Sequence, residues 1–175
     1  MNAVSPSGAA GYWQFLEATG TRYGLEISTE VDERYHVEKA TQAACNYFKE
    51  AFTVFSDWCL VAASYNMGID GISKQLEKQR SDNYFDLLLN EETSRYLFRI
   101  IALKELCTDP LKYGFHLRQR DFYSPCKYTV TNIDSSIDDL ALFAKLNGIS
   151  YKELKILNPW LRTNTLTNKS KKKYA

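Results

Sequence analysis

Apolar side chains recur at helical spacing through the first hundred residues. Between Val37 and Phe55 they follow one another at steps of three and four, which places them on one face of a helix. They are Ala40, Ala44, Tyr47, Phe48, Ala51, Phe52 and Phe55. Asp57 is placed to cap a second helix, which carries Leu60 and is stopped by the turn at Gly68. The spacing thus predicts two consecutive helices.

Two further helices are expected before residue 108. One follows Asp70, with Ile72 and Leu76 on its apolar side. Another begins after Asn90 and ends near Cys107, because the Asp-Pro pair that follows cannot extend it. Its inward positions are Thr93, Tyr96, Leu97, Ile100 and Ile101. The first 107 residues are therefore predicted to be nearly all helix.

The chain changes character after residue 107. Residues 108–127 hold two prolines, a glycine and several aromatic residues, which indicates an irregular linker. Beyond it, residues 128–131 alternate as a strand does, and residues 136–146 and 151–157 favour short helices. With a returning strand, these elements predict a small α+β unit. The predicted domains and linker are residues 1–107, 108–127 and 128–175.

Composition excludes several classes of partner. The 22 basic and 21 acidic residues give a net charge of +1, so no overall field attracts nucleic acid or anionic lipid. Only the lysines of residues 169–173 form a basic run, and a solvated loop explains them equally well. The longest apolar run, residues 58–63, is too short to span a membrane. We expect no nucleic-acid partner and no transmembrane segment in this chain.

Cysteine and histidine positions do not predict a metal or cofactor site. The four cysteines form no Cys-x-x-Cys pair, and the two histidines share no ligand spacing with them. Cys45 and Cys59 lie among helical apolar positions and are expected in the core. No nucleophile elbow, phosphate loop or dinucleotide fingerprint occurs. We expect neither a metal nor a cofactor.

Five stretches of the first domain, in order and in register, resemble the goose-lysozyme-like lytic transglycosylases of the membrane-bound murein type, which carry an SLT domain. They read AVSPSGAAGYWQF, TGTRYGL, VDERYHVEKATQAACNYF, DWCLVAASYNMG and NEETSRYLFRIIA. The stretch from Tyr128 to Leu161 resembles a LysM repeat, a βααβ module that binds N-acetylglucosamine-containing glycans. The resemblance implies a mainly α lysozyme-like (SLT) domain followed by a small α+β LysM module.

The resemblance also implies an activity. Members of this family cleave the β-1,4 bond between N-acetylmuramic acid and N-acetylglucosamine without water, leaving a 1,6-anhydro sugar. One glutamic acid suffices, because the nucleophile is a hydroxyl of the same sugar. The implied partner is the glycan strand of peptidoglycan. The implied location is the bacterial cell envelope, in the periplasm or at the outer membrane.

The expected catalytic acid is not found among the 175 residues. In the family it begins a Glu-Ser motif, which would stand a few positions before Met1. Glu17 and Glu92 match other positions of the pattern, so no catalytic residue is expected here. The closing strand of the LysM module would likewise extend past Ala175. We therefore expect a fragment truncated at both ends.

Five residues of the first domain are expected to bind substrate by resemblance to the family. They are Ser5, Gln14, Tyr65, Asn66 and Glu92. Gln14 offers both a donor and an acceptor to a sugar or acetamido group. Tyr65 and Asn66 end a helix, where side chains project into a cleft. Ordinary alternatives exist: Ser5 suits a turn, and Glu92 suits the first turn of a helix.

Glycines and large aromatic residues near these positions allow two interpretations. Gly8 and Gly11 either let the backbone approach a sugar or simply form tight turns. Trp13 could stack on a sugar ring, whereas Phe55 and Trp58 are expected in the core.

Seven residues of the tail match the two loops of a LysM glycan groove. They are Asp134, Ser135, Ser136, Leu157, Asn158, Pro159 and Trp160. The family's Gly-Asp-Thr is replaced here by Ile-Asp-Ser, a departure that bears on glycan affinity rather than on the fold. Two other functions remain open: a non-catalytic peptidoglycan-binding adaptor and a purely helical interaction protein.

Overall fold

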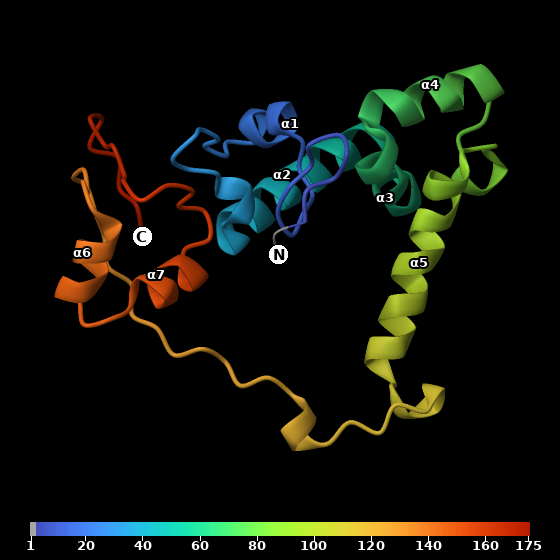
Figure 1. The fold of residues 1–175 in the computed structure, drawn as a ribbon. Helices are drawn as coiled ribbons and strands as arrows, with labels where there is room; N and C mark the ends of the chain where they lie inside the picture. The colour runs from blue at the N-terminus through green and yellow to red at the C-terminus, as the bar shows by residue number, and fades with distance from the viewer. Residues whose placement is uncertain (1–2) are drawn as a thin grey trace. The chain divides into compact units, whose positions relative to one another are not determined.

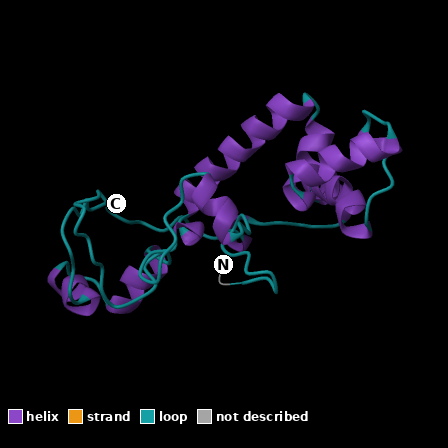
Figure 2. Cartoon of the chain, turned by 90° about the horizontal axis from the view of Figure 1, so that it is seen from above, coloured by secondary structure: helices purple, strands orange, loops and turns teal. Residues whose placement is uncertain are grey.

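The computed structural model describes residues 3–175, which are mainly helical (Figures 1 and 2). The α-helices of this part are α1 (Glu17–Arg22), α2 (Val37–Phe55), α3 (Trp58–Met67), α4 (Ile69–Gln79), α5 (Glu91–Thr108), α6 (Leu140–Leu146) and α7 (Tyr151–Leu157). Between the described residues, β pairing is confined to isolated antiparallel bridges. The fold class expected from sequence, mainly helical with a smaller module, is confirmed.

The chain forms two compact units. The first unit contains Met1–Tyr47 and Tyr128–Ala175, and the second contains Phe48–Lys127. The division falls inside α2. The domain boundaries expected from sequence stay a prediction.

Side-chain caps set the beginnings of the long helices. The Asp57 carboxylate accepts a hydrogen bond from the Leu60 N–H at 2.8 Å, which starts α3 as predicted. Gly68, with φ of +86°, ends that helix and allows α4 to follow at once. Asn90 caps α5 through a 2.8 Å bond from the Thr93 N–H. The local signals in the sequence thus place these helix ends correctly.

The core of the second unit lies where α3 packs against α4 and α5. Its buried members are Leu60, Ala63, Ile72, Tyr84, Leu87 and Leu97. Ile72 is completely buried, whereas Lys74 and Lys78 of the same helix are exposed. The apolar face predicted for α4 is therefore confirmed.

Four residues that the sequence pattern placed on buried faces are exposed: Cys45, Trp58, Ile100 and Ile101. Trp58 keeps 63% of its surface exposed, although its ring stacks on Phe52 with a 4.6 Å centroid distance. Two residues of helix separate it from the core residue Leu60, a rotation of about 200°. Cys45 is also exposed, because it lies on the side of α2 opposite the buried positions 40, 44, 47 and 51. Cys59 is half-buried against the core of the second unit.

The core of the first unit combines residues from both ends of the chain. Its buried members are Ala10, Val31, Tyr35, Leu140, Ala144, Leu154, Trp160, Leu161, Leu166 and Tyr174. Helices α6 and α7 pack together within this unit. The small C-terminal module therefore buries apolar surface against the N-terminal residues as well as within itself.

The C-terminal module differs from the sequence-based expectation in two places. Helix α6 begins at Leu140 rather than at Ser136, because the Asp139 side chain caps it. The strand expected over residues 128–131 is not formed, and these residues are exposed. Antiparallel pairing begins with Ile133 opposite Tyr174.

We expect Ile72→Ala to lower the free energy of unfolding by about 2–5 kcal/mol, because it removes a completely buried side chain. Lys74→Ala is the matched control on the exposed side of α4, and it should change the unfolding free energy by less than about 0.5 kcal/mol. Denaturant titration of both variants measures the two effects. Equal losses would show that α4 does not bury this face.

Candidate functional site

The loop that carries Ser5 is closed by its own hydrogen bonds. The Ser5 hydroxyl accepts a bond from the Ala9 N–H at 3.0 Å, and the Ser5 N–H donates to the Ala9 carbonyl at 2.9 Å. A bridge pairs Val4 with Ala10, and Gly8 turns the loop with φ of +82°. Ser5 thus serves the turn that its sequence suggests, and it remains half-buried beside solvent.

Gln14 is held in an unusual backbone conformation with its side chain fixed. Its φ is +51°, a left-handed value that is uncommon outside glycine. The side-chain Nε2 donates to the Gly11 carbonyl at 2.7 Å and to the Ala3 carbonyl at 3.2 Å. The amide nitrogen is therefore engaged by the backbone, and the exposed Oε1 is the atom able to accept a donor from a ligand.

Arg34 binds the backbone of the loop that contains Gln14. Its guanidinium forms a bidentate pair with Asp32, with N–O distances of 2.9 and 2.7 Å. It also donates to the carbonyls of Gly8 at 2.9 Å and Phe15 at 3.2 Å. The hydrogen bond to Asp32 raises the pKa of Arg34 despite its burial. A buried ion pair thus fixes both ends of the stretch that contains Gln14.

The close approach of the Arg34 backbone, rather than of a sugar, explains why a glycine is needed at position 11. A Cβ added there would lie 1.9 Å from the Arg34 carbonyl oxygen, and the φ of Gly11 is +76°. At Gly8 the φ is also positive, but no atom lies within 4 Å of the added Cβ. Trp13 is held as well, since its Nε1 donates to the Thr41 hydroxyl at 2.8 Å.

A second polar cluster forms where α3 ends and α5 begins. The Thr93 hydroxyl donates to Asn66 Oδ1 at 2.7 Å, and Asn66 Nδ2 donates to Glu92 Oε1 at 3.2 Å. Thr93 is completely buried, whereas Glu92 is exposed. The Tyr84 hydroxyl donates to the Ser94 carbonyl at 2.8 Å and so anchors the start of α5. The buried threonine therefore orients the asparagine amide, and the amide positions the carboxylate.

Tyr65 lies beside this cluster on α3. Its ring packs against Phe48 with a centroid distance of 5.0 Å, and it is half-buried. The structure thus joins Asn66 and Glu92 by a direct hydrogen bond within the second unit. Ser5 and Gln14 belong to the first unit. A substrate groove shared by all five residues stays a prediction.

The C-terminal module carries an open pocket of about 450 Å³. It is lined by Asp134, Ser135, Ser136, Asn168, Lys169 and Lys171. The first of the two predicted glycan-binding loops thus lines a pocket, together with a loop that was not predicted. The Ser136 hydroxyl accepts a bond from the Asn168 N–H at 2.8 Å, which ties the two loops together.

The second predicted glycan-binding loop, residues 157–160, does not line this pocket. The Trp160 ring is buried between His36 and Tyr174, at centroid distances of 5.9 and 5.6 Å. The Asn158 side chain donates to the Leu154 carbonyl at 3.0 Å and so closes α7. Leu157 is exposed, and Pro159 is half-buried. Packing accounts for Trp160 and Asn158, and a contact of this loop with glycan stays a prediction.

Two stretches of the chain match models of protein families. Residues 1–87 match the model described as transglycosylase SLT domain, and residues 129–175 match the one described as soluble lytic transglycosylase C-terminal LysM-like domain. Residues 1–87 thus carry a transglycosylase SLT domain, and residues 129–175 carry a LysM-like domain. The SLT domain includes Ser5, Gln14, Tyr65 and Asn66, and the LysM-like domain includes the 450 Å³ pocket.

Two curated relatives are similar to this chain over most of its length. Both are named "Membrane-bound lytic murein transglycosylase D" and come from Escherichia coli, one from strain K12 and one from strain O6:H1 CFT073. Each is 30% identical over 170 residues, which is 94% of this chain and 37% of the relative. The chain thus spans little more than a third of their length. Within residues 3–175, every helix is too short or too polar to cross a bilayer.

Glu30 and Glu33 of the SLT domain favour the ionised state. Glu33 is 2% exposed, and burial alone would raise its pKa. The bond from the Glu26 N–H at 2.8 Å and the ammonium groups of Lys39 and Lys172 outweigh this effect, so the pKa of Glu33 is lowered. The pKa of Glu30 is lowered by its bonds with Thr167 and Thr165. Neither glutamate is suited to hold a proton at neutral pH. Within the described residues, no three His, Cys, Asp or Glu side chains are grouped to hold a metal ion.

Sequence reasoning did not recognise four residues that organise these sites. Arg34 and Asp32 stand two positions apart, and a buried pair of that kind is not distinguishable in sequence from exposed charges. Thr93 appears only as one inward position of a helical pattern. Asn168 lies in a polar, lysine-rich run that composition assigns to a solvated loop, yet it is 5% exposed. Its polar neighbours gave no signal of burial.

We expect Gly11→Ala to be much more destabilising than Gly8→Ala. Both place a side chain at positive φ, which costs about 1 kcal/mol, but only the Cβ at position 11 collides with the Arg34 carbonyl. Thermal unfolding of the two variants gives the comparison. Similar midpoints for both would contradict the close approach of these two backbone segments.

The stability of the first unit should fall in acid. The pKa of Glu33 is lowered in the folded state, so its contribution is complete above the ordinary value of 4.5 and is lost as the pH falls through the folded value. Glu33→Gln should make the loss of unfolding free energy below pH 4.5 shallower than in the unmodified protein. The exposed Glu38→Gln is the control and should leave the slope as it is. Urea titrations at several pH values measure it; identical slopes for all three proteins would refute this role.

Proposed function

We propose that this chain is part of a lytic transglycosylase that cleaves the β-1,4 bond between N-acetylmuramic acid and N-acetylglucosamine in peptidoglycan and leaves 1,6-anhydro ends. The match of residues 1–87 to the SLT domain carries this proposal, since it contains four of the five residues expected to bind substrate. The name of the two relatives, lytic murein transglycosylase, supports this proposal. The proposed location is accordingly the cell envelope.

In this proposal Gln14 accepts a hydrogen bond from the substrate. Its Nε2 is held by two backbone carbonyls, so Oε1 is presented in a fixed direction to an acetamido N–H or a sugar hydroxyl. The left-handed backbone of Gln14 is stabilised by the surrounding loop, which Arg34 holds through the Gly8 and Phe15 carbonyls. Substrate therefore meets a preorganised acceptor rather than a mobile side chain.

Glu92 is proposed as a second acceptor, for sugar hydroxyls or for an amino group of the peptide stem. Asn66 occupies one lone-pair direction of Oε1, and the remaining acceptor capacity of the carboxylate faces solvent. Thr93 acts as a positioning residue, because its hydroxyl decides which end of the Asn66 amide faces Glu92. Tyr65, which precedes Asn66 on α3, is proposed to offer its half-buried ring to a sugar.

We assign the catalytic proton to none of the carboxylates of this chain. A single acid can protonate the leaving oxygen and then accept the proton of the attacking hydroxyl, provided that its pKa is raised by an apolar pocket. Glu30 and Glu33 have the opposite shift. The role of residues 1–175 is then to bind and orient the glycan. The pocket beside Asp134 and Ser136 is proposed to hold the strand further along.

The lowered pKa values of Glu30 and Glu33 also favour a second candidate, a peptidoglycan-binding adaptor without catalysis. The two candidates share the binding site and differ in whether it can support bond cleavage. Binding and cleavage therefore need separate measurements.

We expect the 175-residue polypeptide to co-sediment with insoluble peptidoglycan. Glu92→Gln should weaken this binding by about tenfold, because hydrogen bonds to a charged acceptor are the stronger kind. Glu91→Gln is the matched control: Glu91 is the preceding residue, is exposed, and pairs with Arg95 rather than with Asn66. Equal binding by both variants would contradict the site at Glu92.

Cleavage is tested in a chimera in which residues 1–175 replace the matched stretch of the Escherichia coli relative. The chimera should release 1,6-anhydro muropeptides, whereas the 175-residue chain alone should release none, since a general acid contributes a factor of about 10²–10⁴. A folded chimera that binds peptidoglycan and releases no product would favour the adaptor.

A further inference from the structure

Residues 26–34 form a tight turn that we call the acidic hairpin, and its backbone pairs with the C-terminal module. A bridge joins Ile27 to Asp32 within the hairpin, and another joins Val31 to Leu161 of the module. The Asp32 N–H donates to the Trp160 carbonyl at 2.9 Å, and the Arg162 N–H donates to the Glu30 carbonyl at 2.7 Å. Segments about 130 positions apart in the sequence thus share main-chain hydrogen bonds.

The Glu30 side chain is bound entirely by the module. Its Oε1 accepts a bond from the Thr165 hydroxyl at 2.8 Å, and its Oε2 accepts one from the Thr167 N–H at 2.7 Å. The Thr167 hydroxyl adds a third bond, at 3.2 Å. These bonds to a charged acceptor lower the pKa of Glu30, so the carboxylate is ionised at neutral pH.

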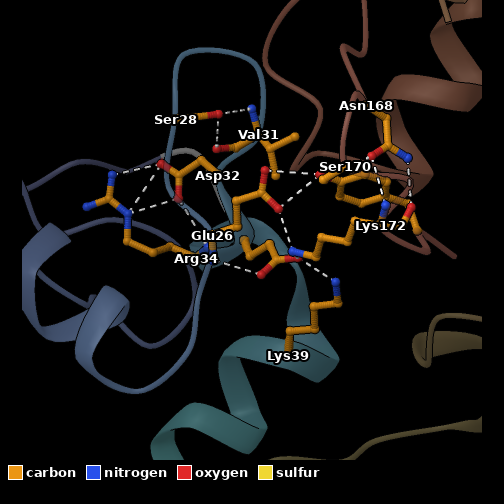
Figure 3. A network of polar contacts seen from close by, with 11 residues as sticks. Glu26, Ser28, Val31, Asp32, Arg34, Lys39, Asn168, Ser170 and Lys172 are labelled. Atoms are coloured by element: carbon orange, nitrogen blue, oxygen red, sulfur yellow. Dashed lines mark hydrogen bonds and ion pairs between the residues drawn. The ribbon is translucent and has the colours of Figure 1, made fainter. Parts of the chain in front are cut away.

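Glu26 and Glu33 bind the end of the module through Lys172 and Tyr174. Figure 3 shows the Glu26 and Lys172 side chains of this network. The Lys172 ammonium pairs with Glu26 and lies 3.3 Å from Glu33. The Tyr174 hydroxyl donates to the Glu26 carboxylate at 3.0 Å, and burial together with that bond raises the pKa of Tyr174 to about 12. Tyr174 therefore remains a donor throughout the physiological range.

The module presents Lys172 in a fixed direction. The Asn168 side chain accepts a bond from the Lys172 N–H at 2.9 Å and donates to its carbonyl at 2.7 Å. Lys171, the preceding residue, has a left-handed φ of +54°. Figure 3 shows the Lys172 side chain extending from this loop toward Glu26 and Lys39 of the N-terminal part. The buried Asn168 side chain thus fixes the backbone of Lys172, the residue whose ammonium pairs with the acidic hairpin.

Apolar and cationic ring contacts complete the contact surface. Trp160 lies between His36 and Tyr174, and the Arg162 guanidinium lies 4.2 Å from the centre of the Tyr35 ring. Buried Val31 and Leu161 join the same core. Residues 111–132, by contrast, are all exposed. The module is therefore joined to the N-terminal residues by a buried apolar core with a polar margin, in addition to the covalent linker.

We propose that the acidic hairpin is a docking surface for the C-terminal module, residues 133–175, which holds it without help from the linker. The LysM-like pocket and the Gln14 loop then belong to one body, so a glycan bound at the pocket stays at a fixed distance from the loop. This inference concerns the association of two segments of the chain, and it stands whether or not the chain acts on peptidoglycan.

The test is to cut the linker in the folded full chain. A site for a specific protease is inserted after Tyr123, which is fully exposed, and the cleaved protein is passed over a size-exclusion column under native conditions. The two pieces should elute together and separate in denaturant. Pieces that elute apart while both remain folded would overturn the proposal.

Variants identify the surface responsible. Glu30→Gln should raise the dissociation constant of the cleaved pieces about tenfold, because it weakens bonds to a charged acceptor. Lys172→Met should also raise it, whereas Glu38→Gln and Lys169→Met, exposed residues outside the contact, should leave it unchanged. Circular dichroism of each uncut variant shows whether it is folded.

A double variant separates docking from a general loss of stability. Glu30→Gln combined with Thr165→Val should weaken association by clearly less than the product of the two single effects, since the first weakens and the second removes the same hydrogen bond. Fully multiplicative effects, or equal weakening by the control variants, would refute a docking surface at Glu30.

Discussion

Consecutive buried charges in the acidic hairpin organise the first unit. Arg34 and Glu33 are 9% and 2% exposed, and charges so buried are tolerated only when they are paired and hydrogen-bonded. Arg34 finds its partners in Asp32 and in the loop that carries Gln14. Glu33 finds its partners in Lys39 and in Lys172 of the C-terminal module. Neighbouring residues of one turn thus fix two different parts of the chain.

In the second unit, buried neutral groups rather than buried charges fix the position of the candidate binding residues. Thr93 is buried and donates to Asn66, whose amide then contacts Glu92. A hydroxyl and an amide can be buried at lower cost than a charge, provided that each finds its partner. The apolar core around Ile72 and Leu97 holds α3 and α5 together, so that this short relay keeps its geometry. Packing and polar contacts therefore position the proposed acceptor jointly.

Local signals in the sequence predicted most helices, because they involve residues close together in the chain. The 19-residue helix α2, the Asp57 cap and the Gly68 stop all follow from such spacing. Trp58 and Cys45 were wrongly placed in the core, since a residue can lie within an apolar stretch and still point away from its buried face. The strand at 128–131 was wrong because alternation alone does not supply a partner to pair with.

Contacts between distant segments could not be predicted. The hydrogen bond of Glu30 with Thr165 joins positions 135 residues apart, and no spacing rule connects them. The candidate site shows the same limit: Asn66 and Glu92 were named as binding residues, but Thr93, whose buried hydroxyl orients Asn66, was predicted only as an inward position of a helix. The pocket of the module likewise combines the expected Asp134 and Ser136 with an unexpected loop at 168–171. Sequence identified groups able to bind sugar, and tertiary packing decided which of them meet.

The order of partners along the acidic hairpin constrains how this sequence can evolve. Asp32 and Arg34 pair with each other, whereas Glu33 between them pairs with Lys39 and Lys172. Inserting or deleting one residue there would therefore leave buried charges opposite the wrong groups. Residues 111–132 have no such constraint, because they are exposed throughout. Homologues are therefore expected to vary in length at the linker and to keep the hairpin free of gaps.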